Sequence, residues 1–230
     1  MKQTILLILS SLIFFSCGEK ISKSTDLKST KEKASYSIGF RIAKDFKSNK
    51  LDVDSAIVAK GFKDGLDGKQ LLTDEQINKV LMDFQREMYE KKMKEAQGLS
   101  GKNKKDAEVF LAENKNKQGI KTTTSGLQYQ VVKSGNGPSP KAADKVKVHY
   151  IGKLLNGTEF DNSYKRNQPA DIQLNSVIKG WTEALQLMKV GDTWKLFISP
   201  DLGYGDAGAG EVIPPGALLI FEVELLGIEK

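Results

Sequence analysis

The sequence predicts an α+β protein in which an all-helical half precedes several antiparallel strands wrapped around one short helix. Two observations support this prediction. Residues 34–118 repeat apolar side chains every three or four positions, which is the period of an amphipathic helix. After Gly119 apolar and polar side chains alternate, which is the period of a half-buried strand. The 230 residues suffice for one large or two small domains with cores of their own.

The first residues are typical of an export signal. Lys2 precedes an apolar run from Ile5 to Phe15, which is too short to span a bilayer. Cys17, the only cysteine, follows a small residue, as at the cleavage site of a bacterial lipoprotein. We therefore expect residues 1–16 to be a signal peptide, Cys17 to be lipidated and residues 17–33 to be a polar tether. The alternative is an ordinary secretory signal with an incidental cysteine, and either interpretation makes the protein an exported one.

The helical half contains amphipathic stretches with recognisable starts. The first two stretches carry apolar residues at every fourth position: Ile38, Ile42 and Phe46, then Val58, Phe62 and Leu66 behind an N-cap at Asp54. A capping box at Thr73 to Gln76 begins the third, whose apolar stripe is Ile77, Val80, Leu81, Phe84 and Met88. We expect Gly98, Ser100 and Gly101 to interrupt this helix, and a lysine-rich helix to follow as far as Gly119.

Residues 34–118 have too little mutual bulk to bury these stripes in a core of their own. We expect them to form a dimerisation domain, in which the stripes pack against a second copy of the chain. The alternative is a monomeric helical hairpin that folds back on the other half.

Residues 119–230 read as strands around one helix. The alternating runs are centred on Leu127 to Val131, Val146 to Tyr150 and Phe221 to Leu225, and Trp194 to Ile198 is a further strand. Asn156-Gly157 predicts a hairpin turn with positive φ at both residues. A short helix fits between Val177 and Met188.

The composition excludes several kinds of chemistry. One cysteine rules out an internal disulfide, and one histidine, His149, rules out a multi-histidine metal centre. We expect His149 to face away from Tyr150, because neighbours on a strand point to opposite faces. The balance of 35 basic against 29 acidic residues is too mild to indicate a nucleic-acid partner.

Seven short blocks give the strand half a family likeness. In order they are Val148 to Gly152, Gly157 to Asp161, Val177 to Trp181, Ile198 to Asp201, Tyr204-Gly205, Ile213 to Pro215 and Phe221 to Leu226. Their order and spacing resemble those of the FK506-binding-protein (FKBP) type peptidyl-prolyl cis-trans isomerases, over about Gly126 to Glu229. The helical half, followed by Thr124 to Tyr129, is similar to the exported bacterial subgroup, the macrophage infectivity potentiator and its periplasmic relatives. The resemblance implies a curved antiparallel sheet around the short helix, and a homodimer formed through the helical half.

The resemblance also implies a proline pocket. Its catalytic residues would be Tyr150, Phe160, Asp161, Tyr204 and Phe221, and its substrate-binding residues Val177, Ile178, Trp181, Ile213 and Arg166. In the family the tryptophan forms the floor, and the Ile178 N–H and the Tyr204 hydroxyl would donate to substrate carbonyls. Asp161 would lie beside the twisted carbonyl and order Tyr150 and Arg166. Ala170 and Ala209 depart from the commonest pattern, which has a bulky wall residue and a histidine there, so we expect a more open pocket edge.

The expected activity is rotation about Xaa-Pro bonds, assisting the folding of exported proteins. Twisting an amide needs neither nucleophile, cofactor nor metal, because an apolar pocket penalises the polar planar amide more than the twisted one. The expected partners are proline-containing unfolded polypeptides, with FK506-like macrolides as inhibitors, and the expected location is the cell envelope, lipid-anchored at the outer membrane facing the periplasm. Two alternatives remain: a client-binding chaperone with secondary isomerase activity, and a catalytically silent surface scaffold.

One literal motif match is rejected. Gly203 to Gly208 reads G-x-G-x-x-G, but it follows Ser-Pro-Asp, and Pro214-Pro215 come after it in place of a helix. A dinucleotide site requires strand, glycine turn and helix in succession. We expect these glycines to shape a flap over the pocket.

Overall fold

The structure is a computed structural model that describes residues 26–229. The expected signal peptide and the lipidation residue Cys17 lie outside the described residues. The described chain divides into two compact units on either side of the Leu71–Leu72 bond. The first contains α1 (Thr30–Ser48) and α2 (Ser55–Asp67), and the second contains the long helix α3 (Asp74–Asn114) and all the strands.

The helix starts follow from capping side chains. Helix α1 begins at Thr30, four residues before the expected helical segment, because Ser29 and Glu32 form a capping box that the sequence reading missed. The expected cap of α2 is confirmed, since the Asp54 carboxylate accepts the N–H groups of Ala56 and Ile57 at 2.8 and 3.2 Å. Neither α1 nor α2 contains a buried residue.

Helix α3 starts at the capping box that the sequence predicts, Thr73 with Gln76. The predicted interruption at Gly98, Ser100 and Gly101 is wrong, because α3 is continuous for 41 residues. A glycine in a helix costs only about 1 kcal/mol relative to alanine, and without proline that cost does not break the hydrogen-bond ladder. Within the described residues, no helix combines the length and the apolar content that crossing a bilayer requires.

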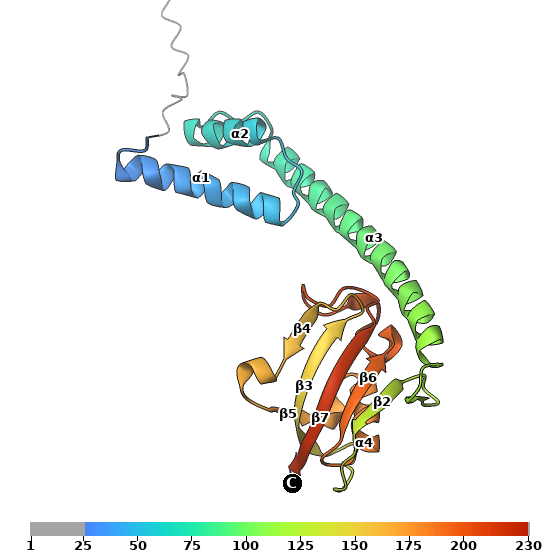
Figure 1. The fold of residues 1–230 in the computed structure, drawn as a ribbon. Coiled ribbons are helices and arrows are strands. Elements are labelled where there is room, and N and C mark those ends of the chain that lie inside the picture. Colours follow the sequence, from blue (N-terminus) through green and yellow to red (C-terminus); the bar gives the residue numbers. More distant parts are fainter. Residues whose placement is uncertain (1–25, 230) are drawn as a thin grey trace, which may run out of the picture. The chain divides into compact units, whose positions relative to one another are not determined.

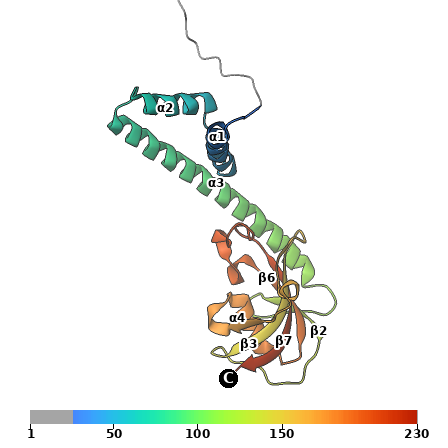
Figure 2. The same cartoon turned by 90° about the vertical axis from the view of Figure 1, so that its left-hand side faces the viewer.

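Within residues 26–229 seven strands form one antiparallel sheet, shown in Figure 1. Their spatial order is β1-β2-β6-β7-β3-β4, and β5 pairs with another part of β3. In chain order they are β1 (Ile120–Thr122), β2 (Gln128–Lys133), β3 (Lys145–Leu154), β4 (Glu159–Asn162), β5 (Ala170–Gln173), β6 (Thr193–Ile198) and β7 (Leu219–Glu229). Helix α4 (Lys179–Leu187) lies against one face, as Figure 2 shows. The expected α+β fold is confirmed.

The hairpin between β3 and β4 is present, but its predicted turn is wrong. Only Gly157 has positive φ, at 85°, whereas Asn156 does not. The Gly157 N–H donates to the Leu154 carbonyl, and the strand register shifts beside the turn. The turn is therefore closed by a hydrogen bond from Gly157 to Leu154 and needs one positive-φ residue instead of two.

The core lies between α4 and the sheet. Ala184 and Leu185 of α4 are fully buried, as are the inward side chains of the central strands β3, β6 and β7. Burying one such leucine or valine stabilises the fold by about 1.5–3 kcal/mol. The close approach of α4 depends on Gly180, where a Cβ atom would lie 2.7 Å from Cγ2 of Ile198. The core therefore fixes α4, and with it one wall of the adjoining pocket.

Candidate functional site

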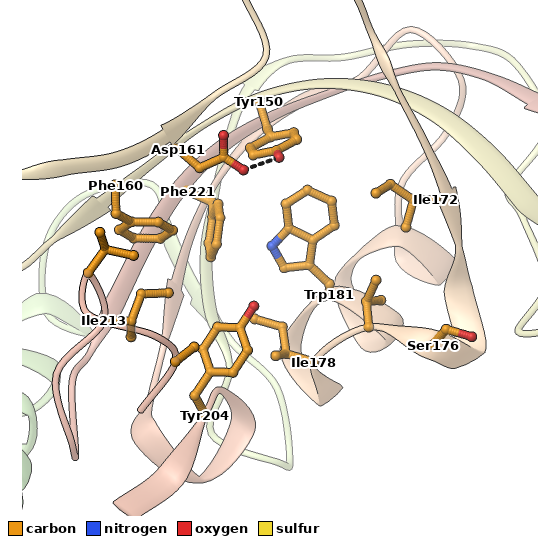
Figure 3. Close-up of a pocket in the computed structure, with 13 residues that line it drawn as sticks. Tyr150, Phe160, Asp161, Ile172, Ser176, Ile178, Trp181, Tyr204, Ile213 and Phe221 are labelled. Carbon is orange, nitrogen blue, oxygen red and sulfur yellow. Dashed lines mark hydrogen bonds between the residues drawn. The ribbon is translucent and has the colours of Figure 1, made fainter. Parts of the chain in front are cut away.

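A cavity of about 510 Å³ lies at the edge of this core (Figure 3). Side chains from β3, β4, β5, α4 and β7 surround it, together with a loop that we call the flap, residues 203–216. The lining residues are Tyr150, Phe160, Asp161, Ile172, Ser176, Val177, Ile178, Trp181, Tyr204, Ala209, Val212, Ile213 and Phe221. Asp161 is the only side chain in this set that is ionised at neutral pH.

Aromatic rings that meet edge to face form one side of the cavity. Trp181, from the first turn of α4, contacts Tyr150 at a centroid distance of 5.2 Å and Phe221 at 5.1 Å, with interplanar angles of 87° and 80°. Phe160 meets Phe221 in the same way, at 5.4 Å and 88°. Edge-to-face contacts hold rings at fixed angles and add about 0.5–1.5 kcal/mol each to area burial. The aromatic surface is therefore pre-formed.

Gly152 makes this aromatic packing possible. It pairs with Asp161 on β4 and with Phe221 on β7, between the two strands that carry the aromatic walls. A Cβ atom at Gly152 would lie 2.6 Å from Cε2 of Phe160 and 2.8 Å from Cε1 of Phe221. Close packing of the two rings therefore explains why the sequence block Val148 to Gly152 ends in a glycine.

The polar side of the cavity is a hydrogen-bonded triad. The Tyr150 hydroxyl and the Arg166 guanidinium both donate to the Asp161 carboxylate, and Nη2 of Arg166 lies 3.1 Å from the Tyr150 hydroxyl oxygen. Burial raises the pKa of Tyr150, and the contact with Asp161 raises it further. Burial also opposes ionisation of Asp161, but the hydrogen bonds from Tyr150 and Arg166 outweigh it and hold the pKa of that carboxyl below its usual value. Asp161 is therefore a carboxylate at neutral pH.

The flap closes the cavity opposite the sheet. Ala209 and Ile213 exchange backbone hydrogen bonds of 2.9 and 3.1 Å, which makes the flap a closed loop. Gly208 has a φ of 64°, and a Cβ atom there would collide with the carbonyl oxygen of Ile213. Short 3-10 turns occupy Pro200–Leu202 and Gly205–Ala207 in place of the strand-turn-helix that a dinucleotide site requires. The glycines thus shape a loop, as the sequence predicts.

The structure brings nine of the ten predicted pocket residues to the lining of this one cavity. The tenth, Arg166, is not a lining residue and touches Asp161 and Tyr150 from outside. Ala209 lines the flap side, whereas Ala170 packs against the core. His149 stacks on Tyr164 and shares a 2.9 Å hydrogen bond with Ser163, away from the cavity.

Sequence reasoning missed three lining residues: Ile172, Ser176 and Val212. Ile172 lies on β5, a strand of four residues that the sequence reading did not predict. Its apolar side chain alternates with polar Asp171 and Gln173, and this short alternation was the available signal. Ser176 ends a 3-10 turn of three residues and Val212 lies in a loop, and no periodicity marks an inward side chain in segments this short.

Comparisons with known proteins agree with this geometry. Residues 137–226 match the family model of the FKBP-type peptidyl-prolyl cis-trans isomerase, and residues 31–131 match the model of the domain amino-terminal to it. The outer membrane protein MIP of Legionella longbeachae is 43% identical over 208 residues, which cover 90% of this chain and 89% of that protein. The peptidyl-prolyl cis-trans isomerase Mip of Coxiella burnetii is 40% identical over the full length of both chains.

A solved structure extends the likeness to three dimensions. The crystal structure of FkpA from Escherichia coli matches with a TM-score of 0.70 and 34% identity, covering 89% of this chain and 99% of that one. Sequence blocks, pocket and both family models therefore agree over both halves of the molecule. The chain belongs to the FKBP-type peptidyl-prolyl cis-trans isomerase family, and its reaction is the cis-trans isomerisation of Xaa-Pro peptide bonds.

Proposed function

We propose that the aromatic cavity is the place where the Xaa-Pro bond rotates. The observation that carries this proposal is the convergence of an apolar aromatic surface with one ionised, pre-ordered carboxylate. In this assignment the proline ring rests on Trp181, and Tyr150, Phe160 and Phe221 form the walls. The backbone N–H of Ile178 and the hydroxyl of Tyr204 hold the substrate carbonyls.

The catalytic effect follows from the loss of amide resonance in the transition state. The twisted amide is less polar than the planar one, so an apolar wall that excludes water destabilises the planar form selectively. Asp161, fixed by Tyr150 and Arg166, lies where it faces the carbonyl dipole as the bond turns. Each 1.4 kcal/mol of such differential stabilisation raises the rate about tenfold.

An isomerisation assay on an Xaa-Pro peptide tests this assignment. Asp161→Val and Tyr204→Phe should each lower kcat/KM about tenfold, since a hydrogen bond to or from a charged or polarised group is worth about 1.5 kcal/mol. Tyr164→Phe is the matched control, because Tyr164 stacks on His149 away from the cavity. If a variant that combines Asp161→Val with Tyr204→Phe is as active as the wild type, the pocket assignment is wrong.

The two alanines adjust substrate preference in this proposal. Ala209 leaves space on the flap side of the cavity, so larger residues before proline should be accepted. Ala170 belongs to the core beside the cavity and contributes less. A peptide series that varies the residue before proline, compared between wild type and Ala209→Phe, tests the idea. An identical ranking in both proteins contradicts it.

We also propose that the protein acts in the cell envelope as a lipid-anchored isomerase of exported proteins. Two things support this: the apolar leader with its sole cysteine, and a relative whose name places it at the outer membrane. Mass spectrometry of the mature N-terminus tests the anchor. It should find a lipid on Cys17 and none in Cys17→Ser, whereas an unmodified cysteine contradicts the proposal.

A second activity, the holding of unfolded clients by a homodimer, is favoured by one observation. In the single chain Phe40, Phe62 and Leu66 of the first unit are 60%, 63% and 75% exposed. Such surfaces suit a second copy and the clients held between the two copies. An aggregation assay with a proline-free client tests this activity. A chain lacking residues 17–118 should no longer suppress aggregation of that client. If the truncated chain suppresses aggregation as well as the full chain does, the helical half does not hold clients. The isomerase assignment is unaffected by that outcome.

A further inference from the structure

One face of α3 contacts the flap. Ser100, Asn103 and Lys104 follow each other at helical spacing and so share that face. The Ser100 hydroxyl donates to Oδ1 of Asp206 at 2.5 Å, and Nζ of Lys104 lies 2.7 Å from the same oxygen. Nδ2 of Asn103 donates to the carbonyl oxygen of Pro215 at 2.8 Å. The helix therefore holds both arms of the flap, one through Asp206 and the other through Pro215.

The helix and the second arm approach each other backbone to backbone. Gly216 has a φ of 69°, and a Cβ atom there would lie 2.5 Å from the carbonyl oxygen of Ser100. Ser100 itself is buried, with 4% of its surface exposed. Only a small side chain on the helix and none on the flap fit this contact. The small residue that suggested a helix interruption is therefore the point where α3 meets the flap.

The flap carries these contacts directly to the pocket. Asp206 lies in the 3-10 turn Gly205–Ala207, which begins immediately after Tyr204. The Gly216 N–H donates to the Gly205 carbonyl at 2.9 Å and joins the two arms. Tyr204 and Ile213 line the cavity from this loop, one on each arm. A shift at either anchoring point therefore moves a cavity wall.

The charges at the first anchoring point support a persistent contact. Hydrogen bonds from Lys104 and Ser100 lower the pKa of Asp206, and the hydrogen bond to Asp206 raises the pKa of Lys104. Both groups are thus ionised over the whole physiological range. The Asp206 side chain is 72% exposed, so water and salt screen the pair, and its contribution to overall stability is small. Its effect should appear in the position of the flap.

We propose that Ser100, Asn103, Lys104 and Asp206 form a helix–flap clamp that positions Tyr204 and Ile213 for isomerisation. None of the four lines the cavity, so they are positioning residues that act through the flap. The inference rests on the cavity being the site of Xaa-Pro rotation. It assigns to α3 a role in the reaction.

Assays on the full chain with a short Xaa-Pro peptide test the clamp. Asp206→Ala should lower kcat/KM about fivefold and Asn103→Ala about threefold, because small displacements of a positioning group cost rate steeply. Lys104→Arg keeps the positive charge and should retain activity. Lys104→Glu places a second carboxylate beside Asp206 and should lower kcat/KM. At about 0.5 M salt the difference in kcat/KM between Asp206→Ala and the wild type should become smaller, because salt screens the Lys104–Asp206 ion pair of the wild type.

Asp83→Ala is the matched control. Asp83 is a partly exposed carboxylate on α3 that pairs with Lys79 and Arg86 on the same helix. It should keep wild-type kcat/KM, and thermal unfolding should show that all variants remain folded. Unchanged activity in both Asp206→Ala and Asn103→Ala, or an equal loss in Asp83→Ala, overturns the clamp. Tyr204→Phe in the same assay separates the two ideas, since its full activity overturns the pocket assignment itself.

Discussion

Gly152 allows two walls of the pocket to pack closely because it has no side chain. The space for its Cβ is already filled by the edges of Phe160 and Phe221. Both rings lie on neighbouring strands, so they can move only by giving up their edge-to-face contact. A single methyl group at this position therefore acts on two walls at once.

We predict that Gly152→Ala lowers kcat/KM about tenfold and destabilises the fold by about 1–3 kcal/mol, the usual cost of overpacking. The peptide assay and denaturant unfolding measure the two effects. Gly157→Asn, at the exposed turn with open space around its Cβ position, is the comparison variant and should keep its activity. Full activity in Gly152→Ala contradicts the pre-formed wall.

Asp161 gives a pH-dependent prediction. Its pKa is lowered in the folded protein, so its ionised form stabilises the fold above the usual carboxyl pKa of about 4. The benefit declines as the pH falls through the folded-state pKa. Because the side chain is 38% exposed, we reduce the expected size to about 0.5–1 kcal/mol.

The measurement is the free energy of unfolding of wild type and Asp161→Asn across the acidic range. The wild type should be the more stable at pH 7, and the difference should vanish below the folded-state pKa. Asp171→Asn provides a comparison away from the cavity, since Asp171 pairs with Lys145 and Lys147. A difference for Asp161→Asn that is constant across the acidic range contradicts the assigned carboxylate.

Among the elements, α3 shows where local composition misleads. Gly98 and Gly101 weaken a helix but do not end it, and apart from the neighbouring backbone of α3 itself no atom lies within 4 Å of where a Cβ would stand at either position. Alanine therefore fits at both. We predict that Gly98→Ala and Gly101→Ala each stabilise α3 by about 1 kcal/mol, measured by the loss of helical circular dichroism on heating. Gly216→Ala should be destabilising by the same method, and a gain there contradicts the close contact with Ser100.

Strands with long alternation could be predicted from the sequence, and shorter ones could not. Val146 to Tyr150 and Phe221 to Leu225 alternate over enough residues to mark one buried face. Strand β5 has four residues and owes its place to pairing with β3, which only the folded sheet supplies. The aromatic pocket residues were predictable because they lie in those well-marked blocks. Ser176, in a short 3-10 turn, and Val212, in a loop, were not predictable, because tertiary contacts fix such positions.

In the whole molecule, the exposed apolar side chains of the first unit indicate an interface with another surface. Phe62 and Leu66 lie one turn apart on α2, and both are largely exposed in the single chain. Mutual burial of such side chains between two copies would stabilise a dimer by about 25 cal/mol for each Å² covered. We therefore predict a dimer in sedimentation velocity for the chain without its signal.

Phe62→Glu should convert this dimer to a monomer, because association would bury an unpaired charge. Activity on a short peptide should remain, since Phe62 lies outside the unit that contains the pocket. Val132→Glu is the matched control, because Val132 is a similarly exposed apolar residue on β2, and it should leave the dimer intact. A monomeric wild type contradicts the prediction.

The place of β7 in the sheet has a consequence for how the enzyme is made. This strand comes last in chain order among the seven strands of the described residues, yet it lies between β6 and β3 and carries Phe221. Until it arrives, β1-β2-β6 and β3-β4-β5 are separate ribbons, each with an open edge that invites pairing with other chains. A growing chain therefore has no complete pocket until β7 has emerged, and a chain that stops at Leu218 should aggregate instead of folding.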